Sequence, residues 1–451
     1  MKSNVKDMTQ GNPLKLILLF ALPLMAGNIF QQLYTVVDTM VVGKALGVGA
    51  LAALGATDWF YWLVLGMVQG VTQGFAILMS KEFGARDYES LRKVVGISST
   101  LSAICALALT GISLLVSPAV LGLLNTPAAI MDTSLLYLRT LLCGLPIVMI
   151  YNLLACILRS LGDGRTPLIA MVVASLTNIG LDVLFVFGFR WGVVGAAAAT
   201  LIAQGASSIF CFIKLRKIDF MALKPTHFKP EAFLSWRLFG LGTPMALQNA
   251  IIAVGGMILQ GVVNGFGVAF IGGFTATNKL YGILEIAAIS YGYSMITYAG
   301  QNLGAKRPDR IRKGMRYAIL VAMITSVVIA AFMLIFGTGI IASFLSGTPE
   351  EVAEATKVGY DYLTVMSLGL PILYVLHVTR STVQGMGNTV LPMGSGIAEF
   401  VMRTGSALLL PGFIGSYGIF LAEVLAWVGA DLILIPSYFV TVKKLERQLD
   451  Q

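Results

Sequence analysis

Long, nearly uncharged apolar stretches recur along this chain of 451 residues and limit what it can fold into. Each is close to the ~20 residues that a helix needs to cross a bilayer. With 57% hydrophobic and only 12% charged residues, a soluble chain could not bury so much apolar surface. The stretches are also too long and uniform for the ~10-residue alternating strands of a membrane barrel. We therefore predict an all-α integral membrane protein.

Twelve transmembrane helices are predicted from these stretches. Their approximate ranges are 15–40, 51–79, 93–117, 133–158, 167–188, 193–214, 238–263, 269–298, 314–337, 357–381, 390–411 and 417–441. Basic residues gather on one side of this arrangement, and the opposite side has only Lys44, Arg190 and Lys357. The positive-inside rule then predicts a multi-pass plasma-membrane protein with both termini in the cytoplasm. The net charge of +9 follows from the basic loops. No basic folded domain of the kind that binds nucleic acid is expected.

The two halves of the chain resemble each other. KEFGARDYESLRK (81–93) aligns with QNLGAKRPDRIRK (301–313), and YLRTLLCGLP (137–146) aligns with YLTVMSLGLP (362–371). Because each half has six predicted spans, both halves begin on the same side of the membrane. Such parallel repeats are typical of secondary transporters, which bind substrates between the repeats. The predicted domains are an N-terminal six-helix bundle (1–218), a cytoplasmic linker (219–235) and a C-terminal six-helix bundle (236–451).

Three features of the chain are similar to a known family: its six plus six spans, the paired loops GARDYESLRK and GAKRPDRIRK, and the stretch QQLYTVVDTMVVGKALGVGALAALGA (31–56). In these features the chain resembles the multidrug and toxic compound extrusion (MATE) family. The resemblance covers almost the whole chain. It implies a V-shaped fold of two pseudo-symmetric six-helix bundles around a central cavity. It also implies export of hydrophobic, often cationic organic compounds, coupled to the entry of protons or sodium ions.

The first half groups polar residues on three predicted spans. A charged side chain at mid-bilayer costs at least ~2.5–3.5 kcal/mol, so acids there are candidate functional groups. Gln31 and Asp38 share one face of the first span, and Asn178 and Asp182, four residues apart, share one face of the fifth. Thr200 lies on the sixth span. If these spans meet, two carboxylates, an amide and a hydroxyl converge in one pocket.

This pocket suits a coupling cation. Two nearby carboxylates out of water resist double ionisation, so the pair could carry a proton near neutral pH. The same oxygens could instead hold a sodium ion at Asp38 and Asp182. The MATE resemblance, especially to its DinF-like branch, implies coupling at Gln31, Asp38, Tyr137, Asn178, Asp182 and Thr200. A polar cluster that only stabilises the bundle is the alternative. No other metal or cofactor is predicted.

The internal repeat favours an ion site in the first half. Asn178 aligns with Arg403, and Asp182 aligns with Ala407. The second half therefore lacks the acid pair. A purely structural cluster would more often recur in both halves.

The second half has its own polar residues. Glu399 and Arg403, at i and i+4, predict a structural ion pair. Glu285 is expected to attract cationic substrates, with Lys279 as an alternative partner. The predicted substrate cavity includes Tyr34, Met257, Gln260, Glu285 and Met295. The sequence assigns no role to Asp58, His377, Glu423 or Asp431.

These observations predict a cation-coupled antiporter that works by alternating access as a monomer, with small organic substrates and membrane lipid as its partners. There is no glycine-rich nucleotide loop and no metal-ligand spacing, so neither an enzyme nor ATP-driven transport is expected. One alternative is a flippase for lipid-linked precursors, which would need a cationic cavity. Within the predicted spans, only Arg139, Lys279 and Arg403 could provide the positive charge of such a cavity. A non-transporting scaffold or a channel is the other alternative.

Overall fold

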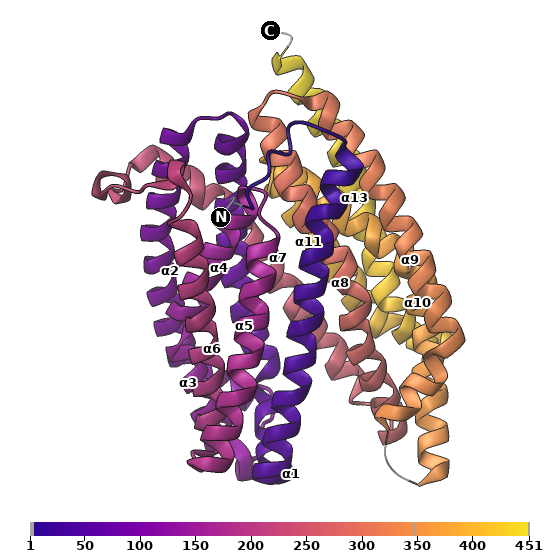
Figure 1. Cartoon of the computed structure of the whole chain (residues 1–451). Coiled ribbons are helices and arrows are strands. Elements are labelled where there is room, and N and C mark those ends of the chain that lie inside the picture. The colour runs from indigo at the N-terminus through magenta and orange to yellow at the C-terminus, as the bar shows by residue number, and fades with distance from the viewer. Residues whose placement is uncertain (1–3, 346–347, 450–451) are drawn as a thin grey trace. The chain divides into compact units, whose positions relative to one another are not determined.

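The computed structural model describes residues 4–345 and 348–449, without the side chains of residues 33, 34, 36, 39, 48 and 268, and this part is helical with no strand (Figure 1). The first helices are α1 (Pro13–Gly84), α2 (Tyr88–Leu123), α3 (Ala128–Cys143), α4 (Leu145–Ser160), α5 (Arg165–Asp182) and α6 (Gly192–Leu215). A π-helix, η1 (Val183–Gly188), follows α5, and two 3-10 turns, η2 (Asp219–Met221) and η3 (Pro225–Phe228), follow α6. The remaining helices are α7 (Ala232–Val263), α8 (Val268–Gly304), α9 (Pro308–Phe344), α10 (Pro349–Gly385), α11 (Val390–Leu409), α12 (Pro411–Ile414) and α13 (Tyr417–Leu449).

All the predicted spans are helical, and some of them extend over two consecutive helical elements. Within the described residues, ten helices are long and apolar enough to cross a membrane, or eleven if the bent pair α3 and α4 counts as one span. The expected span 269–298 is helical as α8 but is not among them. Its polar residues, including Asn278, Lys279 and Glu285, lower its mean hydropathy.

Two breaks in the helices bear on the expected spans. The label α1 covers two helices that meet at a kink at one non-helical residue, Gly47 (φ 82°, ψ −177°), so the first two expected spans are separate helices. Only glycine adopts this conformation without steric strain. The fourth expected span is divided into α3 and α4, which meet at Gly144 with a bend of 46°. Pro146, in the first turn of α4, lacks the N–H that would continue the helical bonding.

Contacts between residues divide the chain into two compact units. Unit 1 comprises Leu22–Ala250 and the N-terminal segment up to Thr9, and unit 2 comprises Gln10–Ala21 and the chain from Ile251 onward. This division falls inside α1 and α7, not in the expected linker. The start of α1 belongs to unit 2 because Ser294 donates a hydrogen bond to the Ile17 carbonyl (3.2 Å). The boundaries 1–218 and 236–451 follow the sequence repeat and stay a prediction.

A stripe of glycines explains why the first part of α7 packs within unit 1. Gly66, Gly70 and Gly74 recur every four residues on α1. A Cβ on Gly70 would lie 2.5 Å from the Cα of Ala246, and one on Gly74 would lie 2.4 Å from the Cα of Gly242. The Asn249 amide donates a hydrogen bond to the Gly66 carbonyl (2.8 Å). Small residues at this spacing let two helix backbones approach closely inside a membrane.

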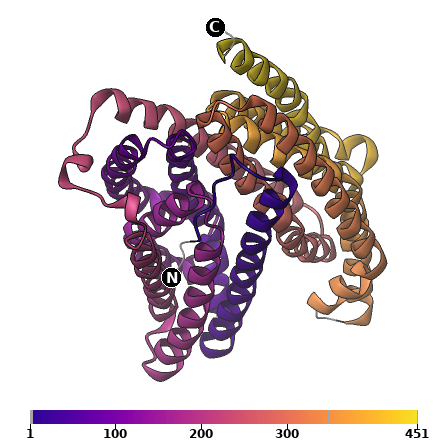
Figure 2. The same cartoon turned by 45° about the horizontal axis from the view of Figure 1, so that its top comes forward.

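The linker between α6 and α7 is packed on α2, as Figure 2 shows beside the start of that helix. A Cβ on Gly96 of α2 would lie 2.2 Å from the His227 carbonyl oxygen. The Thr100 hydroxyl donates to the Phe228 carbonyl (3.0 Å). The His227 side chain is 3% exposed, with Nε2 3.1 Å from an Oε atom of Glu89. The linker is therefore a docked segment of unit 1, although its polar, proline-marked sequence is typical of a free connection.

Unit 2 is held together by aromatic packing between α8, α10 and α13. The rings of Phe274 and Tyr362 stack with centroids 4.5 Å apart, and Tyr362 and Phe420 stack at 5.2 Å. Trp427 is fully buried and stacks on Tyr281 at 6.0 Å. Stacked pairs add to the stability that the burial of large aromatic rings provides. This core brings the charged residues of α10 and α13 close to α11.

Candidate functional site

Helices α1, α5 and α6 bring polar side chains together inside unit 1. Asp182 is 0% exposed and Asn178 is 1% exposed. The Asp182 carboxyl lies within hydrogen-bonding reach of the Asp38 carboxyl on α1. Asp182 is also the last residue of α5, immediately before the π-helix η1. Wider π turns of this kind occur frequently at functional sites.

The carboxyl pair has no donor for its buried oxygens. Among the described residues, Oδ1 of Asp38 and both oxygens of Asp182 are buried without a hydrogen-bond partner. A hydrogen bond between two carboxyl groups needs a proton on one of them. If both are ionised, the two charges repel each other in a medium that screens them poorly. The pair therefore requires either a proton or a bound cation.

Asn178 is oriented by α6. Its Nδ2 donates to the Thr200 hydroxyl at 3.4 Å, and that hydroxyl donates to the Ala196 carbonyl at 3.2 Å. The Asn178 Oδ1 atom is buried and lacks a donor among the described residues. Four acceptor oxygens on Asp38, Asn178 and Asp182 thus have no donor among the side chains that the structure describes. Among the described residues, no three or more His, Cys, Asp or Glu side chains form a group suited to binding a metal ion.

The other predicted coupling residues differ in their surroundings. Tyr137 is 9% exposed and belongs to the same hydrophobic cluster as Val42 of α1, Val186 of η1 and Val193 of α6. This cluster joins α3 to the helices that carry the site. The Gln31 side chain is exposed. The side chain of Tyr34, predicted for the substrate cavity, lies outside the described residues.

In unit 2, Glu399 and Arg403 lie 2.9 Å apart, as the i, i+4 spacing predicts. They belong to a larger network than the sequence indicated. Arg380 of α10 donates to Glu399 (2.7 Å), and Arg403 donates twice to Glu423 of α13 (3.0 and 2.8 Å). Arg380 was missed because it lies at the end of the expected tenth span, where a cation is unremarkable. The structure continues α10 to Gly385 and buries Arg380.

Glu285 has a different partner from the one considered. Lys279 is exposed, and the His377 Nε2 atom lies 3.0 Å from a Glu285 carboxyl oxygen instead. The pairing joins α8 to α10, which spacing along one helix cannot reveal. Of the other cavity candidates, Met295 is fully buried inside unit 2 and the Gln260 amide donates to Asn264 (2.9 Å).

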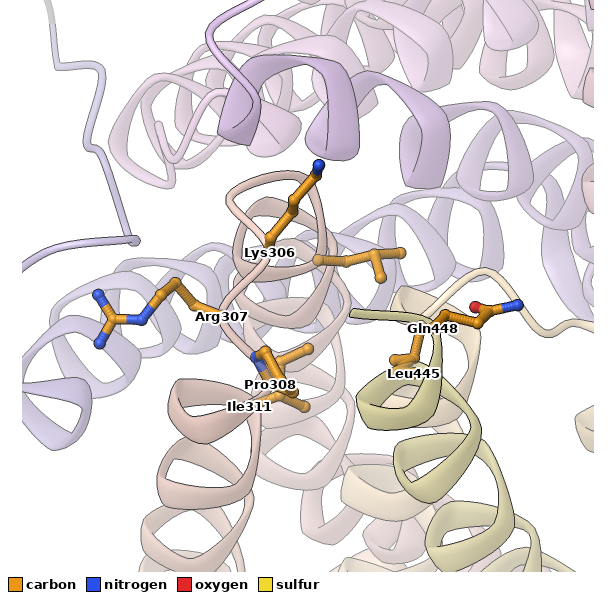
Figure 3. A pocket seen from close by; sticks show the side chains of 7 residues that line it. Lys306, Arg307, Pro308, Ile311, Leu445 and Gln448 are labelled. Atoms are coloured by element: carbon orange, nitrogen blue, oxygen red, sulfur yellow. The ribbon is translucent and has the colours of Figure 1, made fainter. Parts of the chain in front are cut away.

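A pocket of about 170 Å³ lies in another part of unit 2, at the α8–α9 turn and the end of α13 (Figure 3). Its lining residues are Leu303, Lys306, Arg307, Pro308, Ile311, Leu445 and Gln448. None of the candidate coupling or cavity residues lines it.

The long apolar helices are those of a multi-pass membrane protein. Residues 23–184 and 244–408 match the model of the MatE family, one block in each half, and the chain belongs to this family. It is 30% identical to "Probable multidrug resistance protein YpnP" of Bacillus subtilis (strain 168) over 424 residues, 92% of each chain. It is 24% identical to "Multidrug export protein MepA" of Staphylococcus saprophyticus over 426 residues, again 92% of each chain.

Solved structures show the same fold. A crystal structure of MATE in complex with MaL6 matches with a TM-score of 0.90 at 22% identity, covering 99% of this chain and 100% of that one. An outward-facing multidrug resistance MATE family transporter of the MOP superfamily matches with a TM-score of 0.89 at 23% identity, with coverage of 99% and 100%. The all-α transporter fold is thereby confirmed. Membership of the DinF-like branch stays a prediction.

Proposed function

We propose that this protein is an antiporter that exports small, hydrophobic, often cationic organic compounds in exchange for a proton or a sodium ion. The names of the relatives, multidrug resistance and multidrug export proteins, support the substrate class. The proposal of cation coupling rests on four buried acceptor oxygens of Asp38, Asn178 and Asp182, which have no donor within the described part of the chain. A plasma-membrane location, cytoplasmic termini and a monomeric state are part of the same proposal.

A cation would supply what these oxygens lack. A proton on one carboxyl group provides the donor for a hydrogen bond between Asp38 and Asp182. A sodium ion would be coordinated by the oxygens themselves, which are the ligands that hard cations prefer. The full hydrogen-bonding capacity of the site is used only when a cation is present, so occupancy stabilises this arrangement of α1, α5 and α6.

The site can couple cation binding to helix movement because its two acids lie on different helices. When the cation leaves, repulsion between the carboxylates acts directly between α1 and α5. Elsewhere along their length these two helices pack closely, since a Cβ on Gly27 of α1 would lie 3.0 Å from the Sδ atom of Met171 and 3.4 Å from the Cα of Leu168 on α5. A close-packed interface changes between discrete arrangements more readily than it deforms continuously. Cation binding would then shift the balance between transport states through its different affinity for each.

The positions of the basic residues do not support the flippase alternative, which requires a cationic cavity. Arg139 and Lys279 are exposed, and Arg403 is neutralised by Glu399 and Glu423 at 2.9 and 2.8 Å. No described cavity offers a cluster of unpaired cations for a pyrophosphate group. A scaffold or a channel gives no reason for two buried carboxyl groups without donors.

Transport by purified protein in liposomes tests the proposal. An imposed proton or sodium gradient should drive movement of a fluorescent organic cation such as ethidium, and the gradient that succeeds identifies the coupling ion. Asp182→Asn and Asp38→Asn should each reduce gradient-driven transport at least tenfold, equivalent to about 1.4 kcal/mol. Asp132→Asn, which removes an exposed acid of α3, is the matched control and should transport normally. Wild-type rates in Asp182→Asn would contradict the proposal.

A further inference from the structure

Charged side chains on α10, α11 and α13 form a continuous buried ladder inside unit 2. Its order is Ser395, Arg380, Glu399, Arg403 and Glu423, and the ion-pair distances between neighbouring members are 2.7, 2.9 and 2.8 Å. Ser395 accepts a longer bond from Arg380 (3.4 Å). Two guanidinium groups and two carboxylates balance each other along this ladder. Because charges buried inside a membrane are costly unless they are paired, the balance explains how the four can be accommodated.

Asp431 is a fifth ionisable side chain beside this ladder. It lies on α13, is 7% exposed, and interacts electrostatically with Arg380 of α10 and Glu399 of α11. Its Oδ1 atom is buried with no donor among the described residues. The Nε atom of Arg380 is also buried without an acceptor there. Arg380 therefore directs its bonded nitrogen, Nη2, to Glu399 and Ser395, and not to Asp431.

The charge balance decides the state of Asp431. With Asp431 ionised, three carboxylates would face two guanidinium groups, which leaves one negative charge without compensation in the protein interior. With a proton on Asp431, the ladder is neutral. The arrangement in the structure, in which Arg380 is bonded to Glu399 and Asp431 has a bare oxygen, is the one that a protonated Asp431 stabilises.

We propose that Asp431 is a second proton-binding site of this transporter, located in unit 2 and separate from the Asp38–Asp182 pair. When Asp431 loses its proton, its carboxylate competes with Glu399 for Arg380. The bridge between α10 and α11 is then weakened and one between α10 and α13 is strengthened. Proton occupancy thereby determines which of two helices Arg380 is bound to.

The position of Asp431 on its helix supports this assignment. Glu423, Trp427 and Asp431 are spaced by four residues and lie on one buried face of α13. On the rest of that face, Glu423 binds Arg403, and the ring of Trp427 stacks on Tyr281 of α8 while its Nε1 atom is buried without an acceptor among the described residues. The groups that face Asp431 are thus Arg380 from α10 and Glu399 from α11, with Glu423 two turns away on its own helix.

The sequence repeat shows that this site is not shared by the first half. Aligned from their common aromatic–glycine pair (WG and YG), α6 has Ala197 and Gly205 where α13 has Glu423 and Asp431. Each half thus contains an acid constellation that the other half lacks. The inference does not depend on the proposed antiport, because proton binding at Asp431 can be measured without transport.

Infrared difference spectroscopy of the purified protein in lipid, titrated between about pH 5 and pH 9, tests the proposal. A protonated carboxyl group has a C=O band that disappears on ionisation. Wild type and Asp182→Asn should both show a titrating band that Asp431→Asn lacks, and in Asp431→Glu this band should be shifted. Asp132→Asn should leave it unchanged. If Asp431→Asn loses no band, or if the lost band does not change with pH, the proposal is wrong. Should Asp431→Asn fail to fold, the band shift in Asp431→Glu decides the question.

Discussion

Arg403 binds glutamates on two different helices, so replacing it tests whether the charge ladder holds unit 2 together. Its side chain is 5% exposed and donates three hydrogen bonds, one to Glu399 and two to Glu423. In Arg403→Met, Glu399 keeps its bond to Arg380 (2.7 Å). Glu423 loses its only ion-pair partner among the described residues. Removing one partner of a buried pair costs about 3–5 kcal/mol, because the remaining charge is uncompensated.

A double variant separates this cause from the loss of packing. In Arg403→Met/Glu423→Gln the stranded charge is absent, and most of the lost stability should return, as expected when a buried ion pair is replaced completely. The exposed pair Arg312–Glu446 has a similar bond length, 2.6 Å, but side chains that are 50% and 30% exposed. Arg312→Met should therefore cost no more than about 1 kcal/mol.

Denaturant-induced unfolding of the purified protein, followed by tryptophan fluorescence, would measure the three variants side by side. The expected order of stability is wild type and Arg312→Met, then the double variant, then Arg403→Met. If Arg403→Met were as stable as Arg312→Met, or if adding Glu423→Gln restored nothing, the ladder would not be an energetic unit and the charge argument for Asp431 would weaken with it.

Two further predictions concern packing and capping in unit 1. Gly74→Leu should destabilise the protein by about 1–3 kcal/mol or more, since a Cβ would lie 2.4 Å from the Gly242 backbone. The control Gly111→Leu on α2, where a Cβ would have nothing within 4 Å, should be nearly neutral. Equal unfolding midpoints for the two variants would contradict the close approach of α1 and α7. Asp87 is the N-cap of α2, and hydrogen bonds from the backbone N–H (3.0 Å) and hydroxyl (2.7 Å) of Ser90 lower its pKa. The contribution of Asp87 to the free energy of unfolding should be complete above its ordinary pKa of 3.8. This contribution should be lost as the pH falls through the lower pKa that Asp87 has in the folded protein. Asp87→Ala should cost about 0.5–2 kcal/mol at neutral pH and Asp87→Asn much less; an Asp87→Ala protein as stable as Asp87→Asn would exclude the cap.

Sequence reasoning succeeded where one helix sets the geometry. The i, i+4 spacing put Asn178 and Asp182 on one face, and the insertion cost of an acid singled out Asp38. Glu399 and Arg403 follow the same rule. That α1 and α5 meet is a hypothesis that the sequence alone does not establish, and the absence of the acid pair from the second half bears only on whether the pair is an ion site.

Partners on different helices were harder to predict. Nothing in the spacing connects Glu285 to His377, or Arg380 to Glu399, because those distances depend on helix packing. Arg380 was also placed at the membrane edge, since hydropathy locates the end of a span only to within several residues. The kink at Gly47 depends on the backbone angles of one residue, and hydropathy carries no information about them.

The two crossings between units inside α1 and α7 have a mechanical consequence. The chain passes from one unit to the other between Ala21 and Leu22 and again between Ala250 and Ile251, within helices. A loop lets the parts that it joins rotate almost freely, whereas a continuous helix resists bending and twisting. Movement of one unit would therefore appear as curvature in these two helices. Pro23 lies beside the first crossing and Pro244 lies about two turns before the second, and each removes a hydrogen bond from its helix, so we expect both helices to bend near these prolines.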